Sequence, residues 1–372
     1  MIKRSAESVA AMLNEWYSYI RKNKVEEAEF LKNEIFSILD EMEENQDVLL
    51  YYSLLDFRHQ IMLSYLKPES AGDVNNRLKQ LEDKKDELTG LLDYYFYFFK
   101  GMYHLKQRDY LTAIGCYKNA ETKLKEVKDE IERAEFHLKI AEAYYYMQQT
   151  PFSMNYAMQA LEIFKQYDLY TIKRVQCRFI IGGNLIDVLN YDKAKEFFRE
   201  ALMETKNLKE KDLHLQATAY FNLGLCSFYE NDYENALENY LFAADIYEEQ
   251  TSFFLPKVFL NLMRVRIKQN QFKEAENLYE KGIDYAIRLK DEECHAKFML
   301  FKATYLQYDE QLIIESFQYF ESKNLFSDLE ELSLDVANYY TENQNFDKAN
   351  SYYRKAIFAR QQIQKGECHY EI

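Results

Sequence analysis

Residues 217–243 read ATAYFNLGLCSFYENDYENALENYLFA and contain the pattern that decides the fold. Gly224 is followed by Ala236, Tyr240 and Ala243, and these last three residues are spaced by four and three positions. On a helix this spacing places a small, an aromatic and a small side chain on one face. Small residues let a second helix approach closely, and the ring fills the space between the two helices. The stretch therefore predicts a tightly packed helix pair.

The small-aromatic-small pattern recurs along most of the chain, and its first members are separated by steps of 40, 41, 42, 39, 41 and 33 residues. Repetition at such a period is typical of tetratricopeptide (TPR) arrays, in which stacked helix pairs share a continuous core. The sequence therefore predicts a right-handed TPR superhelical solenoid of about seven helix pairs over residues 88–372. The other copies are Ala113/Tyr117/Ala120, Ser153/Ala157/Ala160, Ala194/Phe198/Ala201, Ala275/Tyr279/Gly282, a degenerate Ser316/Phe320, and Ala349/Tyr353/Ala356.

The N-terminal part of the chain has a different organisation. Three amphipathic helical stretches lie between residues 5 and 66, the first opened by Ser5 as an N-cap and the last followed by Pro68. We expect a three-helix bundle over residues 1–66. The polar segment 67–87 contains Gly72 and is expected to form a linker or a mobile helix. The predicted fold class is all-α.

The composition limits the possible functions. Only 9 Gly and 3 Pro among 372 residues favour long helices with few turns that need a left-handed glycine. A net charge of −15 without a Lys/Arg cluster argues against nucleic-acid binding. Polar residues interrupt every apolar run and the start lacks a signal-peptide core, so we expect neither a membrane span nor export. Five cysteines without CxxC spacing are expected to be reduced, mostly buried thiols of a cytoplasmic protein.

Several long stretches resemble the Rap family of Bacillus-type regulators. The resemblance covers nearly the whole chain and weakens after residue 285. It implies a TPR protein that binds a response regulator and is inhibited by a short signalling peptide, which is secreted and then imported. The stretches are EMEENQDVLLYYSLLDFRHQIML (41–63), LTGLLDYYFYFFKGMYHLKQRDY (88–110), EIERAEFHLKIAEAYYYMQQTPFSMNYAMQAL (130–161), RVQCRFIIGGNLIDV (174–188) and ATAYFNLGLC (217–226).

The resemblance also implies a catalytic residue in the bundle. In phosphatase members a glutamine enters the regulator's active site and promotes hydrolysis of its aspartyl phosphate, and Gln46 matches that glutamine. Its amide can accept a water hydrogen and donate to another oxygen, which orients the attacking water. No cofactor of the protein's own is implied, because the regulator carries the Mg²⁺. Leu49 and Phe57 share a helical face with Gln46, either as regulator contacts or as bundle core, and Glu132 matches a further regulator-facing position.

Polar residues on the first helices of the central repeats are candidates for peptide binding. Asn222 and Asn261 both fall at position 6 of their repeats, which faces the groove of a TPR array, and an amide there can pair with a peptide group. Asp187 is expected to point inward and to suit the cationic or N–H end of a peptide. Asn184 lies closer to the crossing of its two helices and is a further candidate.

Two functions remain open at this level. The first is a response regulator aspartate phosphatase, and the second is a non-catalytic, peptide-controlled binder that sequesters a DNA-binding regulator. A peptide-sensing transcription factor would need a basic recognition helix, whereas the bundle contains the acidic stretch EMEENQD at residues 41–47. The histidines form no HxxxH or HExxH motif, and no Gly-rich phosphate loop or GxSxG motif is present, so a complete active site within this chain is not expected.

Overall fold

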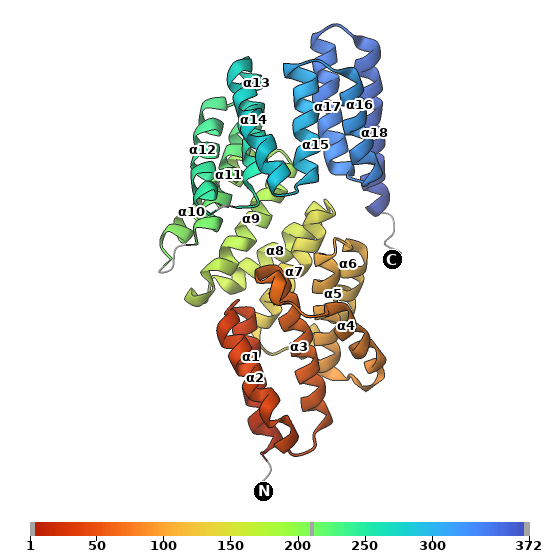
Figure 1. The fold of residues 1–372 in the computed structure, drawn as a ribbon. Coiled ribbons are helices and arrows are strands. Elements are labelled where there is room, and N and C mark those ends of the chain that lie inside the picture. Colours follow the sequence, from red (N-terminus) through yellow and green to blue (C-terminus); the bar gives the residue numbers. More distant parts are fainter. Residues whose placement is uncertain (1–3, 209–211, 251, 368–372) are drawn as a thin grey trace. The chain divides into compact units, whose positions relative to one another are not determined.

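The computed structural model describes residues 4–208, 212–250 and 252–367, and helices account for nearly all of them (Figure 1). The first nine α-helices are α1 (Ala6–Arg21), α2 (Val25–Ile38), α3 (Gln46–Leu66), α4 (Val74–Asp83), α5 (Gly90–Lys106), α6 (Tyr110–Glu121), α7 (Glu130–Tyr146), α8 (Thr150–Phe164) and α9 (Thr171–Asp187). They are followed by α10 (Tyr191–Lys206), α11 (Leu213–Tyr229), α12 (Tyr233–Glu249), α13 (Leu255–Lys268), α14 (Phe272–Arg288), α15 (Glu292–Phe301), α16 (Glu310–Ser322), α17 (Phe326–Glu342) and α18 (Phe346–Glu367). Short 3₁₀ turns include η3 (Lys85–Glu87), and a π-helical turn, η6 (Lys302–Leu306), extends α15.

The predicted all-α architecture is confirmed: three N-terminal helices precede helix pairs that run from α5/α6 to α17/α18. The chain forms two compact units, residues 1–144 and 145–372. The first unit therefore contains the predicted bundle, the segment 67–87 and the beginning of the repeats. Within that segment, α4 packs against α3 through buried Leu78 and Leu81, and Arg77 pairs with Asp56 at 2.6 Å.

In several pairs a glycine on the first helix precedes the small-aromatic-small pattern of the second helix. The short distance between the two helices of a pair explains this glycine. A Cβ atom added to Gly101 of α5 would lie 2.4 Å from the ring of Tyr117 of α6. The same substitution at Gly182 would meet Phe198 at 2.4 Å, and at Gly224 it would meet Tyr240 at 2.8 Å. The aromatic ring thus occupies the volume that a larger side chain would need.

This packing predicts opposite effects for two glycines of one helix pair. Gly101→Ala is expected to lower the free energy of unfolding by about 1–3 kcal/mol, because the new methyl group overlaps the Tyr117 ring. Gly115→Ala is the matched control: Gly115 lies in α6 with nothing within 4 Å of the added Cβ. There alanine is expected to raise the free energy of unfolding by about 0.5–1 kcal/mol through its helix propensity. Thermal unfolding measures both changes, and a Gly101→Ala protein as stable as the wild type would contradict the packing.

The turns within five successive helix pairs share a left-handed backbone conformation. Arg108, Gln148, Leu189, Asn231 and Asn270 separate the two helices of five successive pairs, and all have φ between 55° and 62°. The prediction that few turns need a left-handed glycine is confirmed, because Gly90 is the only glycine with positive φ among the described residues, but the left-handed conformation itself recurs in these turns on other residues. Non-glycine residues take this conformation at a cost of roughly 1–2 kcal/mol each, which the packing of both flanking helices offsets.

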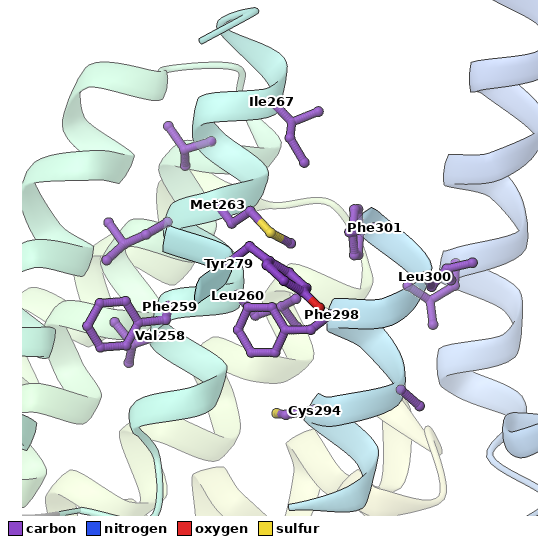
Figure 2. Packing of buried hydrophobic residues seen from close by; sticks show 14 of the residues in the cluster. Val258, Phe259, Leu260, Met263, Ile267, Tyr279, Cys294, Phe298, Leu300 and Phe301 are labelled. Carbon is purple, nitrogen blue, oxygen red and sulfur yellow. The ribbon is translucent and has the colours of Figure 1, made fainter. Parts of the chain in front are cut away.

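The core of the second unit continues through the repeats whose sequence pattern is weakest. Met263 is fully buried at the position that Gly224 has in the preceding pair, and it lies beside Tyr279 (Figure 2). The rings of Tyr279 and Phe298 then meet at 6.1 Å between centroids. Different side chains thus fill the space between packed helices in these repeats. The array therefore continues where the sequence pattern is degenerate.

Candidate functional site

Gln46 is the first residue of α3, and its placement follows from the cap of that helix. The side chain of Asn45 accepts a hydrogen bond from the backbone N–H of Val48 at 3.1 Å, which fixes the start of the helix. The Gln46 side chain is exposed. Its Nε2 donates to Oε2 of Glu87, in the 3₁₀ turn before α5, at 2.7 Å. The structure therefore presents the candidate catalytic amide at the surface of the first unit.

A hollow of about 220 Å³ lies between α1, α3 and α5, and Asp47 and Val48, the two residues that follow Gln46, line it. It is mostly apolar, and such a concave surface suits an apolar side chain of a docked partner. The residues that line it are Ala10, Asn14, Asp47, Val48, Tyr51, Leu91, Leu92 and Tyr95.

The two residues predicted to accompany Gln46 differ in exposure. Leu49 is 38% exposed and is available to a partner. Phe57 is completely buried, and its ring lies 6.1 Å from that of Tyr103 on α5. The prediction that Phe57 contacts the regulator is thus corrected in favour of its alternative, bundle core: Leu49, near the start of α3, faces solvent, whereas Phe57, about two turns further along, packs against α5. A docking role for Phe57 would require this packing to change.

Glu132 is likewise buried, with 1% of its surface exposed. It accepts hydrogen bonds from the hydroxyls of Tyr17 at 2.9 Å and Tyr94 at 3.2 Å, and it pairs with Arg21 at 3.2 Å. Arg21 also pairs with Asp129 at 2.9 Å. Burial raises the pKa of Glu132 to about 7, although Arg21 and the Tyr17 hydroxyl oppose the shift.

The contacts of Glu132 correct its predicted position. In this structure it joins α7 to α1 and α5 and offers no surface to a regulator. No sequence pattern indicated this network, because Tyr17 lies 115 residues from Glu132.

Two of the predicted peptide-binding residues are also internal. Asn184 is fully buried, and its Nδ2 donates to Ser153 Oγ at 2.8 Å and to the Ile180 carbonyl at 2.9 Å. Asn261 is 4% exposed, and its Nδ2 donates to the Lys257 carbonyl at 2.8 Å. Asn184 therefore ties α9 to α8. Neither residue offers an accessible amide in this structure, which corrects the expectation that Asn261 faces the groove and the prediction that Asn184 binds the peptide.

Asp187 and Asn222 remain accessible. Asp187 ends α9 and is exposed, yet partial enclosure by its neighbours raises its pKa to about 6, opposed by the guanidinium of Arg360. Asn222, on α11, is half-buried. Among the described residues it has no hydrogen-bonding partner, so its amide is available to a ligand. These two residues are the predicted peptide contacts that the structure leaves open to solvent.

Arg264 of α13 forms a cluster that no sequence pattern indicated. Its guanidinium lies over the rings of Phe228 at 5.0 Å and Phe301 at 5.4 Å. It pairs with Glu331 at 2.7 Å and with Asp335 at 3.1 Å, both on α17. The guanidinium outweighs burial and holds the pKa of Glu331 below its usual value. The cluster thus joins the first helices of four successive pairs in the second unit.

Other kinds of site are missing from the part of the chain that the structure describes. There, no three His, Cys, Asp or Glu side chains gather as they would around a metal ion, and no helix is long and apolar enough to cross a membrane. Four of the five cysteines are buried free thiols, as expected: Cys116, Cys177, Cys226 and Cys294. Cys368 lies outside the described residues.

Comparison with known proteins places this arrangement in a family. A family model for the N-terminal region of response regulator aspartate phosphatase H matches residues 3–64. Response regulator aspartate phosphatase I of Bacillus subtilis strain 168 is 44% identical over 362 residues, which cover 96% of this chain and 92% of that relative. The chain belongs to the Rap family. Gln46 and Leu49 lie within the matched N-terminal region.

Rap proteins similar to this chain carry two kinds of name. Regulatory protein RapF of Bacillus subtilis strain 168 is 41% identical over 376 residues, which cover 99% of this chain and 98% of RapF. The crystal structure of a Rap protein complexed with competence and sporulation factor is also similar, with a TM-score of 0.86 and 41% identity over 97% of this chain and 99% of that chain. Membership of the Rap family thus includes phosphatases and proteins named only as regulators.

Proposed function

We propose that this Rap protein is a response regulator aspartate phosphatase. The observation that carries the proposal is the exposed amide of Gln46 at the start of α3, where the next two residues line an apolar hollow that suits a docked partner. A similar Rap protein, 44% identical, is named response regulator aspartate phosphatase I. The partner is a phosphorylated response regulator, which docks on the bundle and carries the acyl phosphate.

The proposed chemistry requires little of the Rap protein itself. An aspartyl phosphate is already reactive, so hydrolysis is accelerated by holding a water molecule in line with the leaving oxygen. The Gln46 carbonyl would accept a hydrogen of that water, while its NH₂ group donates to a neighbouring oxygen. The regulator supplies the Mg²⁺ that neutralises the phosphoryl charge, and this protein contributes no cofactor. Regulator and enzyme would meet in the cytoplasm.

A short imported signalling peptide is the proposed inhibitor. A similar Rap structure, 41% identical, is described as a complex with competence and sporulation factor. Here Asp187 and Asn222 are the accessible polar residues among the predicted contacts. The Asn222 amide can pair with one peptide group of the ligand, and the Asp187 carboxylate with a cationic group.

Asn222→Ala is therefore expected to weaken peptide binding about 5- to 30-fold, because an amide that pairs with the ligand backbone is lost. Phosphatase activity should persist, so the variant would be active but insensitive to peptide. Asn239→Ala is the matched control, because Asn239 lies on α12, the second helix of the same pair, and bonds only the Asn235 carbonyl among the described residues. Calorimetric titration with the peptide measures the affinity of both variants. Undiminished affinity in Asn222→Ala would show that this residue is not part of the peptide site.

The alternative is a non-catalytic binder that sequesters a DNA-binding regulator. This alternative is supported by the name of RapF, which is 41% identical to this chain and is called a regulatory protein rather than a phosphatase. A panel of response regulators phosphorylated with acetyl phosphate separates the two functions. We expect one regulator to lose its phosphate at least about tenfold faster when the protein is added. Release of a regulator from DNA without loss of phosphate would establish the alternative instead.

A further inference from the structure

The residue that contacts Gln46 is held as firmly as Gln46 itself. Glu87 ends the 3₁₀ turn η3, whose Lys85 forms an ion pair with Asp93 of α5 and lies 4.6 Å from the centre of the Tyr97 ring. Leu88, directly after the turn, is 5% exposed and packs into the unit. The turn is thus anchored on both sides of Glu87, which limits the positions open to its carboxylate.

The contact between Glu87 and Gln46 joins two separately fixed elements. The Asn45 cap fixes the backbone of Gln46, whereas α5 fixes the turn that carries Glu87. The two side chains are 41 residues apart in sequence and meet at 2.7 Å. A surface glutamine without such a partner would rotate freely among several rotamers, so this contact restricts a side chain that is otherwise exposed.

The chemistry of the pair also decides which end of the amide faces outward. An ionised carboxylate only accepts hydrogen bonds, whereas an amide has a donating and an accepting end. Glu87 therefore favours the orientation in which the NH₂ group faces it, because the reverse orientation would bring two oxygens together. In the favoured orientation the carbonyl oxygen points away from Glu87. That oxygen is the atom that must accept a hydrogen from the attacking water.

We propose that Glu87 is a positioning residue, which holds the Gln46 amide in the orientation that presents its carbonyl oxygen to water. The inference rests on the proposed phosphatase function and deepens it. Glu87 touches neither water nor the phosphoryl group and acts only through Gln46. Nothing in the sequence pattern pointed to it, because its partner lies in another helix.

The kinetic test measures how fast each Glu87 variant dephosphorylates its regulator. The regulator is the one that the panel of phosphorylated response regulators identifies. Glu87→Ala is expected to lower kcat about 3- to 10-fold with KM unchanged, because the amide then samples unproductive orientations. Glu87→Gln should keep kcat within about twofold of the wild type, since its carbonyl oxygen can still accept from Gln46. Asp86→Ala is the matched control: it removes a neighbouring exposed carboxylate, and kcat should not change.

A double-mutant cycle tests whether Glu87 acts through Gln46. In the Gln46→Ala background, Glu87→Ala should have no further effect on kcat, because the group that it positions is gone. Equal effects of Glu87→Ala with and without Gln46 would overturn the proposal. An increase of kcat in both Glu87→Ala and Glu87→Gln would overturn it as well, since the carboxylate would then be repelling the phosphoryl group.

A measurement that needs no regulator separates this inference from the proposed function. The protein is labelled with ¹⁵N in the side-chain amides of glutamine, and the Gln46 signal is identified by its loss in Gln46→Ala. In Glu87→Ala this signal should move from its wild-type position, because the hydrogen bond at 2.7 Å is lost, and in Asp86→Ala it should stay there. A Gln46 signal that is the same in wild type and Glu87→Ala would refute the positioning. If the pair is present but no regulator is dephosphorylated, the proposed function fails and the contact stands.

Discussion

Arg264→Ala is expected to lower the free energy of unfolding by about 3 kcal/mol, because Asp335 is largely buried and both carboxylates lose the guanidinium that pairs with them. Glu331 and Asp335 both contact the guanidinium, at 2.7 Å and 3.1 Å. The substitution also removes a cation from between the rings of Phe228 and Phe301. Arg266→Ala is the matched control on the same helix, because Arg266 contacts only Gln269 and Gln271 through described hydrogen bonds. Chemical denaturation of both variants gives the comparison.

The pH dependence of the Arg264→Ala effect is a second readout. Burial already raises the pKa of Asp335 against the opposing guanidinium, and loss of the guanidinium should raise the pKa of Asp335 further and that of Glu331 above its present lowered value. A group with a raised folded pKa contributes stability that is lost as the pH rises through that pKa. The difference between wild type and variant should therefore be larger at neutral pH than at acidic pH. A loss no greater than that of Arg266→Ala, at any pH, would show that the cluster does not stabilise the array.

Gln46→Ala is expected to slow hydrolysis of the aspartyl phosphate about 100-fold, because the water loses the amide that orients it. Affinity for the regulator should change little, since the lost interaction belongs mainly to the transition state. Gln80→Ala, an exposed glutamine on α4, is the matched control and should keep full activity. Single-turnover decay of the phosphorylated regulator, measured beside a binding titration, distinguishes the two effects. Full activity in Gln46→Ala would remove this residue from the mechanism.

The sequence was sufficient to predict the repeats because their physical cause is local. Gly101 must be small because the Tyr117 ring lies against it, and the same contact recurs with a regular period. The left-handed turns were missed for the opposite reason. Leu189 and Arg108 have no intrinsic preference for positive φ, and only the packing of the flanking helices imposes it.

The site could be predicted only in part, because helical register fixes a face but not what covers that face. Leu49 and Phe57 lie eight residues apart on α3, yet only Phe57 reaches α5 and is buried. Asn222 and Asn261 share one repeat position, yet Asn261 is enclosed and bonds its own helix. These differences in burial depend on which neighbouring helix covers each residue. The sequence pattern of one helix does not contain that information.

The central claim is that this Rap protein promotes hydrolysis rather than only holding its regulator. The most direct measurement follows the loss of aspartyl phosphate from a regulator in about twentyfold molar excess over the protein. A catalyst turns over, so we predict that all of the phosphate is released at a rate proportional to the amount of protein added. Gln46→Ala should not accelerate the release. Loss of phosphate at the regulator's intrinsic rate, although the regulator binds, would contradict the claim and show that the protein sequesters its partner.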